Sequence, residues 1–251
     1  MTPLEMVAVI AAGMGAGAIN AVVGSGSLIS FPTLLAVGYS PVTANVSNNI
    51  GLVPGSLSGI FGYRRELEGQ ASRVRKLAIG SIVGSLVGAG LLLALPASVF
   101  DRVVPFFVLG ASLLMVVQPR VSRWVSERRN EDAPDVHVVA VLATFVAGVY
   151  GGYFGAAQGI ILLAVLGIMV PDDIHRSNAV KNVLAGLVNS VAAAYFIAFA
   201  DVAWEAVALV AVGAVVGGAL GARYGRRIPP VALRRLVIAI GLIVAAKLFL
   251  A

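Results

Sequence analysis

The chain alternates between long apolar runs and short polar stretches, and the length of the runs sets the fold class. Seven stretches carry almost no charge: 6–63, 77–100, 103–119, 138–171, 182–200, 206–222 and 236–246. A helix needs about 20 apolar residues to cross a hydrocarbon layer of about 30 Å. These runs lack the polar face that a helix of a soluble bundle presents to water. The pattern therefore predicts an all-α, polytopic membrane protein.

Within these runs, the pattern predicts about eight helical segments in two sets of four. Six are full crossings, at about 41–63, 77–95, 103–118, 174–198, 206–222 and 235–250. A broken segment precedes each set of three, at 4–38 and at 138–170. The second arm of each, about 27–38 or 159–170, would span only about 18 Å, which is too short for an untilted crossing. We therefore expect each broken segment to be a helical hairpin that is re-entrant or barely crosses.

The chain repeats itself when it is shifted by 133 residues. Asn45 then coincides with Asn178, and Asn49 with Asn182. Five glycine pairs also coincide, namely Gly15 with Gly148, Gly26 with Gly159, Gly80 with Gly213, Gly84 with Gly217, and Gly88 with Gly221. Composition alone predicts on the order of one glycine match and about a tenth of an asparagine match. Shared membrane-helix composition explains stray glycine matches, but not two asparagines four residues apart in both copies.

The distribution of basic residues indicates that the two repeats are inverted. Segments 64–76, 119–135 and 223–235 hold fourteen of the 18 lysines and arginines. Under the shift, the basic loop 64–76 maps onto 197–209, which has none, so the charge bias reverses as inverted repeats require. Cytoplasmic loops collect Lys and Arg, so we expect the three basic segments inside and both termini outside. The predicted organisation is a first repeat at 1–118, a cytoplasmic linker at 119–136 and a second repeat at 137–251.

Composition excludes several other classes of protein and site. Cysteine is absent and only two histidines are present, which excludes disulfide frameworks, thiolate metal sites and imidazole clusters. The isoelectric point near 10.1 reflects loop arginines rather than a nucleic-acid surface. With 59% hydrophobic and 12% charged residues, the chain is expected in a cell membrane, interpreted as a bacterial inner membrane, without cofactor or metal. Only Glu5 carries charge ahead of the first apolar run, so we expect no cleaved signal peptide.

Glycine-rich breaks interrupt both hairpins, at GSGS (24–27) and GAAQG (155–159). Unwound backbone is tolerated in a membrane only where protein covers it or where it lines a cavity. Free N–H groups and the positive end of the following helix make such a break a cradle for an anion. Close packing through small residues is the alternative, and it is the favoured explanation for the GxxxG stripes. The candidate binding residues of the breaks are Gly24, Ser25, Gly26, Ser27, Gln158 and Gly159.

Two polar stripes follow the breaks. Each has members four and seven residues apart along one helix face: Asn45, Asn49 and Ser56 in the first repeat, and Asn178, Asn182 and Asn189 in the second. We expect these stripes to face each other near mid-depth, where inverted-repeat transporters bind substrate. Asn48 is matched by Lys181, an ionisable residue within a membrane helix that would supply charge for an anion. The candidate substrate-binding residues here are Asn45, Asn48, Asn49, Asn178, Lys181 and Asn182.

Structural explanations for the same residues stay open at this point. The asparagine stripe could serve interhelical hydrogen bonding. Lys181 lies about two turns from the cytoplasmic end, so its side chain could snorkel to the interface. His175 and Arg176 are expected at the interface rather than in the site.

Motifs at both breaks resemble one known family. The segment SGSLISFPTLLAVG followed by ANVSNN, repeated as GGYFGAAQG and SNAVKN, is similar to the TauE/SafE-type sulfite exporter family over nearly the whole chain. The sequence departs from a fuller glycine pattern at Ser27 and at Ala156–Ala157. The resemblance implies an integral membrane transporter of anions such as sulfite, sulfoacetate and other sulfur-containing or organic acids.

We therefore predict a secondary transporter, an exporter of small anions, that works by alternating access. Its partners are the small anion and the lipid bilayer, without nucleic acid; the sequence gives no oligomeric state, and a homodimer is one option. An anion channel is the alternative, although an inverted repeat with a mid-depth site fits alternating access better. An intramembrane enzyme would need a base for Ser25, but His137 and His175 are expected near the cytoplasmic face.

Overall fold

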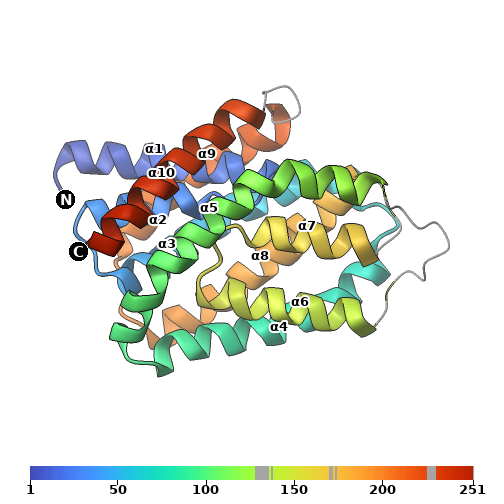
Figure 1. Ribbon diagram of the computed structural model, residues 1–251, viewed down its shortest axis with the longest axis horizontal. Coiled ribbons are helices and arrows are strands. Elements are labelled where there is room, and N and C mark those ends of the chain that lie inside the picture. Colours follow the sequence, from blue (N-terminus) through green and yellow to red (C-terminus); the bar gives the residue numbers. More distant parts are fainter. Residues whose placement is uncertain (128–135, 137, 170–171, 173, 225–229, 251) are drawn as a thin grey trace.

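The computed structural model describes residues 1–127, 136, 138–169, 172, 174–224 and 230–250. In this part the chain is all-helical, with ten α-helices and one short 3-10 turn, η1 (Arg64–Leu67) (Figure 1). The first five helices are α1 (Pro3–Val22), α2 (Ser27–Ala36), α3 (Pro41–Gly62), α4 (Ala71–Ala94) and α5 (Ala97–Glu127). The second five are α6 (Val138–Tyr153), α7 (Gln158–Met169), α8 (Ile174–Phe199), α9 (Trp204–Tyr224) and α10 (Pro230–Leu250).

These helices confirm the predicted fold class. The six expected crossings correspond in position to α3, α4, α5, α8, α9 and α10, and the two expected hairpins to α1–α2 and α6–α7. By length and apolar content, however, α1 can cross a membrane although it was expected as a hairpin arm, whereas α3 is not among the helices apolar enough to do so. Helix α4 begins six residues earlier than predicted and α5 runs to Glu127, beyond the expected end at 118. Both extensions contain basic residues. An apolar pattern marks only the membrane-embedded part of a helix, so a helix that continues into the polar interface is longer than the pattern predicts.

The outer surface of the bundle is apolar. Five helices are long and apolar enough to cross a membrane: Pro3–Val22, Ala71–Ala94, Ala97–Val121, His175–Phe199 and Trp204–Tyr224. Only 39–44% of their most apolar windows is buried inside the protein, so most of this surface faces outward. Phe61, Phe106 and Phe199 are each more than 60% exposed. Lipid is the solvent in which such a surface is stable, and the chain is a polytopic membrane protein.

The two halves run in opposite directions. Figure 1 shows that α1 starts at the end of the molecule where both termini lie, whereas α6 starts at the other end. Helix α1 packs parallel to α9, and α6 packs parallel to α4. The close contacts advance together along both helices: Gly13 with Val210 and Gly17 with Ala214 in the first pair, Gly148 with Ser81 and Gly152 with Ser85 in the second. In the first pair, the hairpin helix belongs to the first half and its partner to the second half. In the second pair this assignment is reversed, as inverted-topology repeats require.

In the hairpins, however, the repeat follows a shift of 131 residues rather than 133. Ala214 and Ser81 differ by 133, whereas Gly17 and Gly148, which pack on them, differ by 131. Helix α7 has 12 residues and α2 has 10, and this difference restores the 133 shift from α3 and α8 onward. Two predicted matches are therefore wrong by two residues: Gly15 with Gly148 and Gly26 with Gly159.

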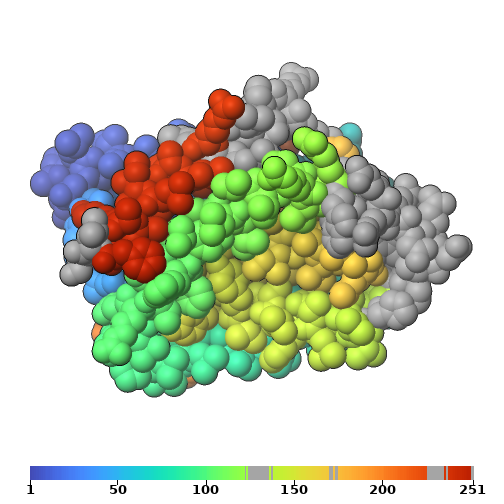
Figure 2. All heavy atoms as spheres, in the orientation of Figure 1, coloured from blue at the N-terminus to red at the C-terminus, as the bar shows by residue number. Residues whose placement is uncertain are grey.

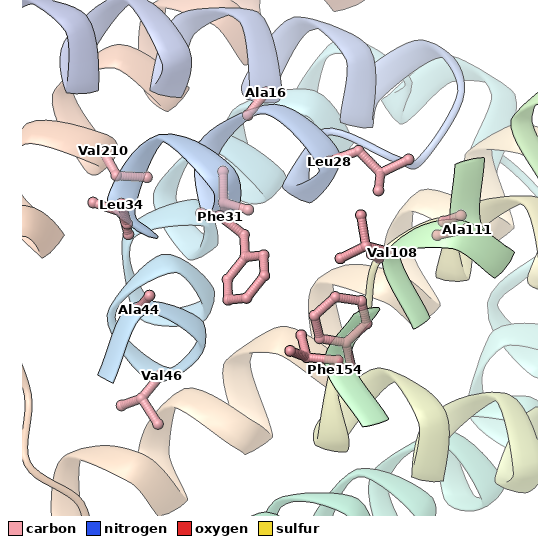
Figure 3. Close-up of a cluster of buried hydrophobic side chains, with 14 of the residues drawn as sticks. Ala16, Leu28, Phe31, Leu34, Ala44, Val46, Val108, Ala111, Phe154 and Val210 are labelled. Carbon is pink, nitrogen blue, oxygen red and sulfur yellow. The ribbon is translucent and has the colours of Figure 1, made fainter. Parts of the chain in front are cut away.

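An aromatic cluster packs the hairpins against α5. Phe31 of α2 and Phe154 of the second break meet edge to face, with ring centroids 5.3 Å apart (Figure 3). Phe107 of α5 stacks on Phe154 at 5.5 Å, and Phe100 lies beside it at 6.1 Å. Figure 2 shows α5 in green lying across this face between α10 in red and the second hairpin in yellow. The cluster fixes both short arms in place from one side.

The GxxxG stripes of α4 and α9 are packing surfaces, as expected. A Cβ added to Gly80, Gly84 or Gly88 would lie closer than 3 Å to backbone atoms of α6, and one added to Gly213, Gly217 or Gly221 would meet the backbone of α1 in the same way. Backbone-to-backbone approach replaces the hydrophobic effect as the driving force for association of helices in lipid.

This packing predicts opposite effects for two glycine substitutions. Gly84→Ala forces α4 and α6 apart and should destabilise the fold by about 1–3 kcal/mol. Gly110→Ala, in α5, is the matched control, since an added Cβ there meets nothing within 4 Å and alanine is the better helix former. Thermal unfolding in detergent should give a lower Tm for the first and an unchanged or higher Tm for the second. Equal values would contradict the packing role of the stripe.

The inverted arrangement also predicts which loops can be labelled from outside. Asp201, between α8 and α9, and Glu68, after η1, are both exposed and lie at opposite ends of the molecule. Because the chain has no cysteine, Asp201→Cys and Glu68→Cys each create a single thiol. We expect an impermeant maleimide to label only Asp201→Cys in intact cells, and Glu68→Cys only after permeabilisation. Labelling of both from one face would refute the inverted repeat, and reversed labelling would refute the orientation.

Candidate functional site

The two breaks touch each other through their backbones. The Gly159 N–H donates a hydrogen bond to the Gly24 carbonyl oxygen at 3.1 Å. A Cβ added to Gly24 would lie 2.5 Å from the Cα of Gly159, and one added to Gly159 would lie as close to Gly24. Gly24 also has φ +85°, a left-handed conformation that side chains disfavour. Both positions therefore require glycine for a packing reason and one of them for a conformational reason as well.

Both long arms end in the same way. The Gly24 N–H bonds back to the Ile19 carbonyl at 3.0 Å, and the Gly155 N–H bonds back to Tyr150 at 3.0 Å. Gly155 has φ +77°, so each arm closes with a left-handed glycine cap. These caps make Ser27 and Gln158, the first residues of α2 and α7, structurally equivalent, in agreement with the shift of 131.

A pocket lies against the two breaks. It encloses about 450 Å³ including its mouth, and residues of α1, α2, α3, α7 and α8 contribute to its walls. It is lined by Asn20, Ala21, Gly24, Ser27, Gly55, Ser56, Gly59, Gly155, Gln158, Gly159, Asn182, Ala185 and Asn189. Five of these were predicted from the sequence as binding residues: Gly24, Ser27, Gln158, Gly159 and Asn182. On α3 the pocket lies at Ser56, two turns beyond Asn49, so it sits nearer the end of the molecule opposite the termini than predicted.

The pocket wall presents hydrogen-bond donors. Helices α2 and α7 both begin at it, and the N-terminus of a helix carries a partial positive charge. The N–H of Ser27 makes no hydrogen bond within the part of the chain that the structure describes. Asn182 and Asn189 add side-chain amides from α8, and the described lining includes no carboxylate.

Asn20 is a polar residue of the pocket that the sequence analysis missed. Its side-chain oxygen accepts a hydrogen bond from the Gly26 N–H at 2.7 Å, and its backbone oxygen accepts one from Lys181 Nζ at 3.5 Å. It therefore links the first break to α8 while it also lines the pocket. The signal was present in the sequence, since an asparagine stands in an apolar helix four residues ahead of the break.

Lys181 is fully buried inside the protein. Its exposed fraction is 0%, which excludes the alternative that its side chain snorkels to the interface. Its Nζ contacts the Asn20 carbonyl, and it forms no ion pair with a carboxylate within the described residues. Lys181 does not line the pocket; it lies behind Asn20, which does.

Three predicted asparagines hold the hairpins. Asn45 donates from its side chain to the Tyr153 carbonyl at 2.9 Å. Asn178 and Asn182 both donate to the Ala21 carbonyl, at 3.5 and 3.2 Å. Each repeat thus uses its polar stripe to bond the end of the opposite hairpin's long arm. Interhelical hydrogen bonding accounts for Asn45 and Asn178, whereas Asn182 bonds a helix and lines the pocket as well.

The remaining candidates lie outside the pocket lining. Asn49 donates to Asn189 across the α3–α8 contact at 3.5 Å, so it reaches the pocket only through that partner. The side-chain oxygen of Asn48 is buried without a partner among the described residues. Ser25 donates to the sulfur of Met115 at 3.0 Å, and Gly26 packs against the backbone of Ala16.

An ion-pair network closes the end of the bundle near η1. Asp172 pairs with Arg176 at 2.8 Å and also with Arg73 of α4. Gln70 is buried and donates to the Glu66 carbonyl at 2.7 Å. Arg176 and the exposed His175 therefore lie at the end of α8, as predicted, while His137 lies outside the described residues.

Comparison with known proteins agrees with this architecture. A profile of the family described as Sulfite exporter TauE/SafE matches residues 9–248. "Probable membrane transporter protein YfcA" of Escherichia coli K12 is 26% identical over 249 residues, which covers 99% of this chain and 91% of the relative. A "Probable membrane transporter protein" of Haemophilus influenzae is 23% identical over 94% of this chain and 91% of its own length. The chain is therefore a membrane transporter and belongs to the Sulfite exporter TauE/SafE family.

Proposed function

We propose that the protein is a secondary transporter that exports small oxyanions and binds them in the pocket between the two breaks. The observation that carries this proposal is the meeting of two inverted helical hairpins at one pocket, with the N-termini of both short arms in its wall. Substrate sites at the interface of inverted repeats, built from broken helices, are typical of secondary transporters.

The donor set favours an anion over a cation. Helix N-termini and neutral amides donate hydrogen bonds to an oxyanion without the desolvation cost of many charges. Among the described lining residues, Ser27, Gln158, Asn182 and Asn189 are donors of this kind, and none is acidic. A cation would find neutral oxygens of carbonyl, amide and hydroxyl groups beside positive helix ends, and no described carboxylate.

Lys181 supplies the charge for this site from behind its wall. Its Nζ lies 3.5 Å from the backbone oxygen of Asn20, a pocket residue. In an interior of low polarity, an unpaired ammonium favours an anion over a longer range than it would in water. A small rotation of Asn20 or Lys181 during transport would bring the ammonium of Lys181 into direct contact with the bound anion.

The substrate class follows from the donor set and the family together. Sulfite, organosulfonates and other small sulfur-containing or organic acids carry oxygens that such a cradle can bind, and the family's description names sulfite. The names of the relatives specify no substrate.

Alternating access fits the contact between the breaks better than a channel does. The Gly24–Gly159 contact brings two backbone segments together at the pocket, and a carrier must separate such segments to pass substrate. We place the protein in the bacterial inner membrane with the arginine-rich end in the cytoplasm. Two repeats, 1–118 and 137–251, would then exchange roles between the two states.

The test is a binding screen followed by a flux assay. Purified protein is titrated with sulfite, sulfate, short-chain sulfonates and carboxylates, and the best ligand is then used in liposomes. We expect saturable uptake and counterflow, in which unlabelled anion inside accelerates entry of labelled anion. Non-saturating flux without counterflow would indicate a channel, and absence of anion binding would refute the proposal.

Lys181→Gln should weaken binding of the best anion by about 1–3 kcal/mol, or about 5- to 150-fold in Kd, because a charged group near the pocket is lost. Asn182→Ala should have a smaller effect, since it removes one neutral donor. Lys247→Gln is the matched control, because Lys247 is an exposed lysine of α10 outside the pocket. Isothermal titration gives the affinities. Unchanged binding by Lys181→Gln would show that the lysine is structural.

A further inference from the structure

A second concave surface lies between α3 and α9, away from the transport pocket. This α3–α9 groove encloses about 570 Å³ including its mouth and is lined by Ser58, Phe61, Gly62, Ala219, Ala222 and Arg223. Small residues on α9 leave the space, and Ser58 donates to the Val215 carbonyl across the seam at 3.4 Å. None of these residues lines the pocket at the breaks.

Two arginines lie at one end of the α3–α9 groove. Arg223 is part of its wall. The guanidinium of Arg64 lies 4.5 Å from the centroid of the Phe61 ring and donates to the Phe61 carbonyl at 3.1 Å. Within the described residues, neither arginine forms an ion pair with a carboxylate. The groove thus ends in two positive charges that no described acidic side chain neutralises.

The rest of the groove's surroundings are apolar. Leu57 and Phe61 of α3 are 56% and 67% exposed, and Val216 and Leu220 of α9 are 47% and 44% exposed. These side chains lie on helices that span the membrane, and the arginines lie where both helices end. A surface that is apolar along the helices and positive at their ends matches a molecule with hydrocarbon chains and an anionic head.

We infer that the α3–α9 groove binds an anionic phospholipid, with Arg64 and Arg223 on the phosphate and Leu57, Phe61 and Leu220 against the acyl chains. Basic pockets between membrane helices bind anionic headgroups by this combination of charge and apolar contact. Phe61 serves both parts, since Arg64 lies over its ring and Phe61 itself lines the groove.

Lipid binding here would act on the transport pocket through α3. Gly55, Ser56 and Gly59 of the same helix line that pocket, one turn or less from the groove residues. A lipid that holds the ends of α3 and α9 together would restrain the motion of α3. The inference itself does not depend on the substrate, because it concerns a separate surface.

The experiment measures binding of lipid to the purified protein in neutral detergent. Native mass spectrometry and thermal unfolding are recorded with phosphatidylglycerol, with phosphatidylcholine of the same chains, and with inorganic phosphate alone. We expect bound phosphatidylglycerol and a higher Tm, and neither effect with the other two. Stabilisation by inorganic phosphate alone would assign the arginines to a soluble anion and overturn the lipid assignment, as would equal binding of both lipids.

Variants locate the site. Arg64→Gln and Arg223→Gln should each weaken phosphatidylglycerol binding about fivefold, and Arg64→Lys and Arg223→Lys should retain most of it. Arg102→Gln is the matched control, since Arg102 is an exposed arginine on α5 outside the groove. Parent-level binding by the double glutamine variant would refute the site. If that variant does not fold, crosslinking of the parent with a photoreactive phosphatidylglycerol must label α3 or α9, and labelling elsewhere would refute it equally.

Discussion

The contact between Gly24 and Gly159 is the constraint on which the rest of the arrangement depends. Breaking a helix inside a membrane exposes backbone groups that lipid cannot satisfy, so each break must be covered by protein. Here each break covers the other. One backbone hydrogen bond joins them, and the two backbones lie too close together to leave room for a side chain. Two hairpins that must meet in this way need inverted insertion, because only then do their tips approach from opposite faces.

The asparagines and the glycine stripes support this contact from two directions. Asn45, Asn178 and Asn182 bond the carbonyls at the ends of the long arms, where the helical bonding pattern stops. The stripes on α4 and α9 bring the backbones of α6 and α1 close, so each long arm is held along its length. Of these three asparagines, only Asn182 also lines the pocket, so it has both a structural task and a place where it could serve an anion.

Much of the fold could be predicted because the membrane restricts the choices. Apolar run length predicted where the helices lie, although it underestimated α1. The reversal of the basic bias predicted the inversion. Both signals depend on the solvent rather than on detailed packing. The site could be predicted only in part. Its position on α3 depends on how far the hairpins reach, so the pocket lies at Ser56 rather than at Asn49. Burial of Lys181 depends on tertiary packing around Asn20, which spacing along one helix does not reveal.

The two-residue offset between the hairpins makes the site asymmetric. With a shift of 131, Asn20 corresponds to Gly151, and Ser27 to Gln158. The Gln158 side chain occupies the space that a side chain at Gly151 would need, whereas on the other side Asn20 fills its own position and bonds Gly26. Likewise, under the shift of 133, the charged Lys181 of the second repeat corresponds to the neutral Asn48 of the first. The halves share a backbone plan but not a set of charges. In the alternating-access cycle proposed above, the two states reached by exchanging the roles of the repeats would therefore differ in energy. An anion that neutralises the charge of Lys181 would change the energy difference between the two states. A substrate needs such a differential interaction in order to shift a conformational equilibrium.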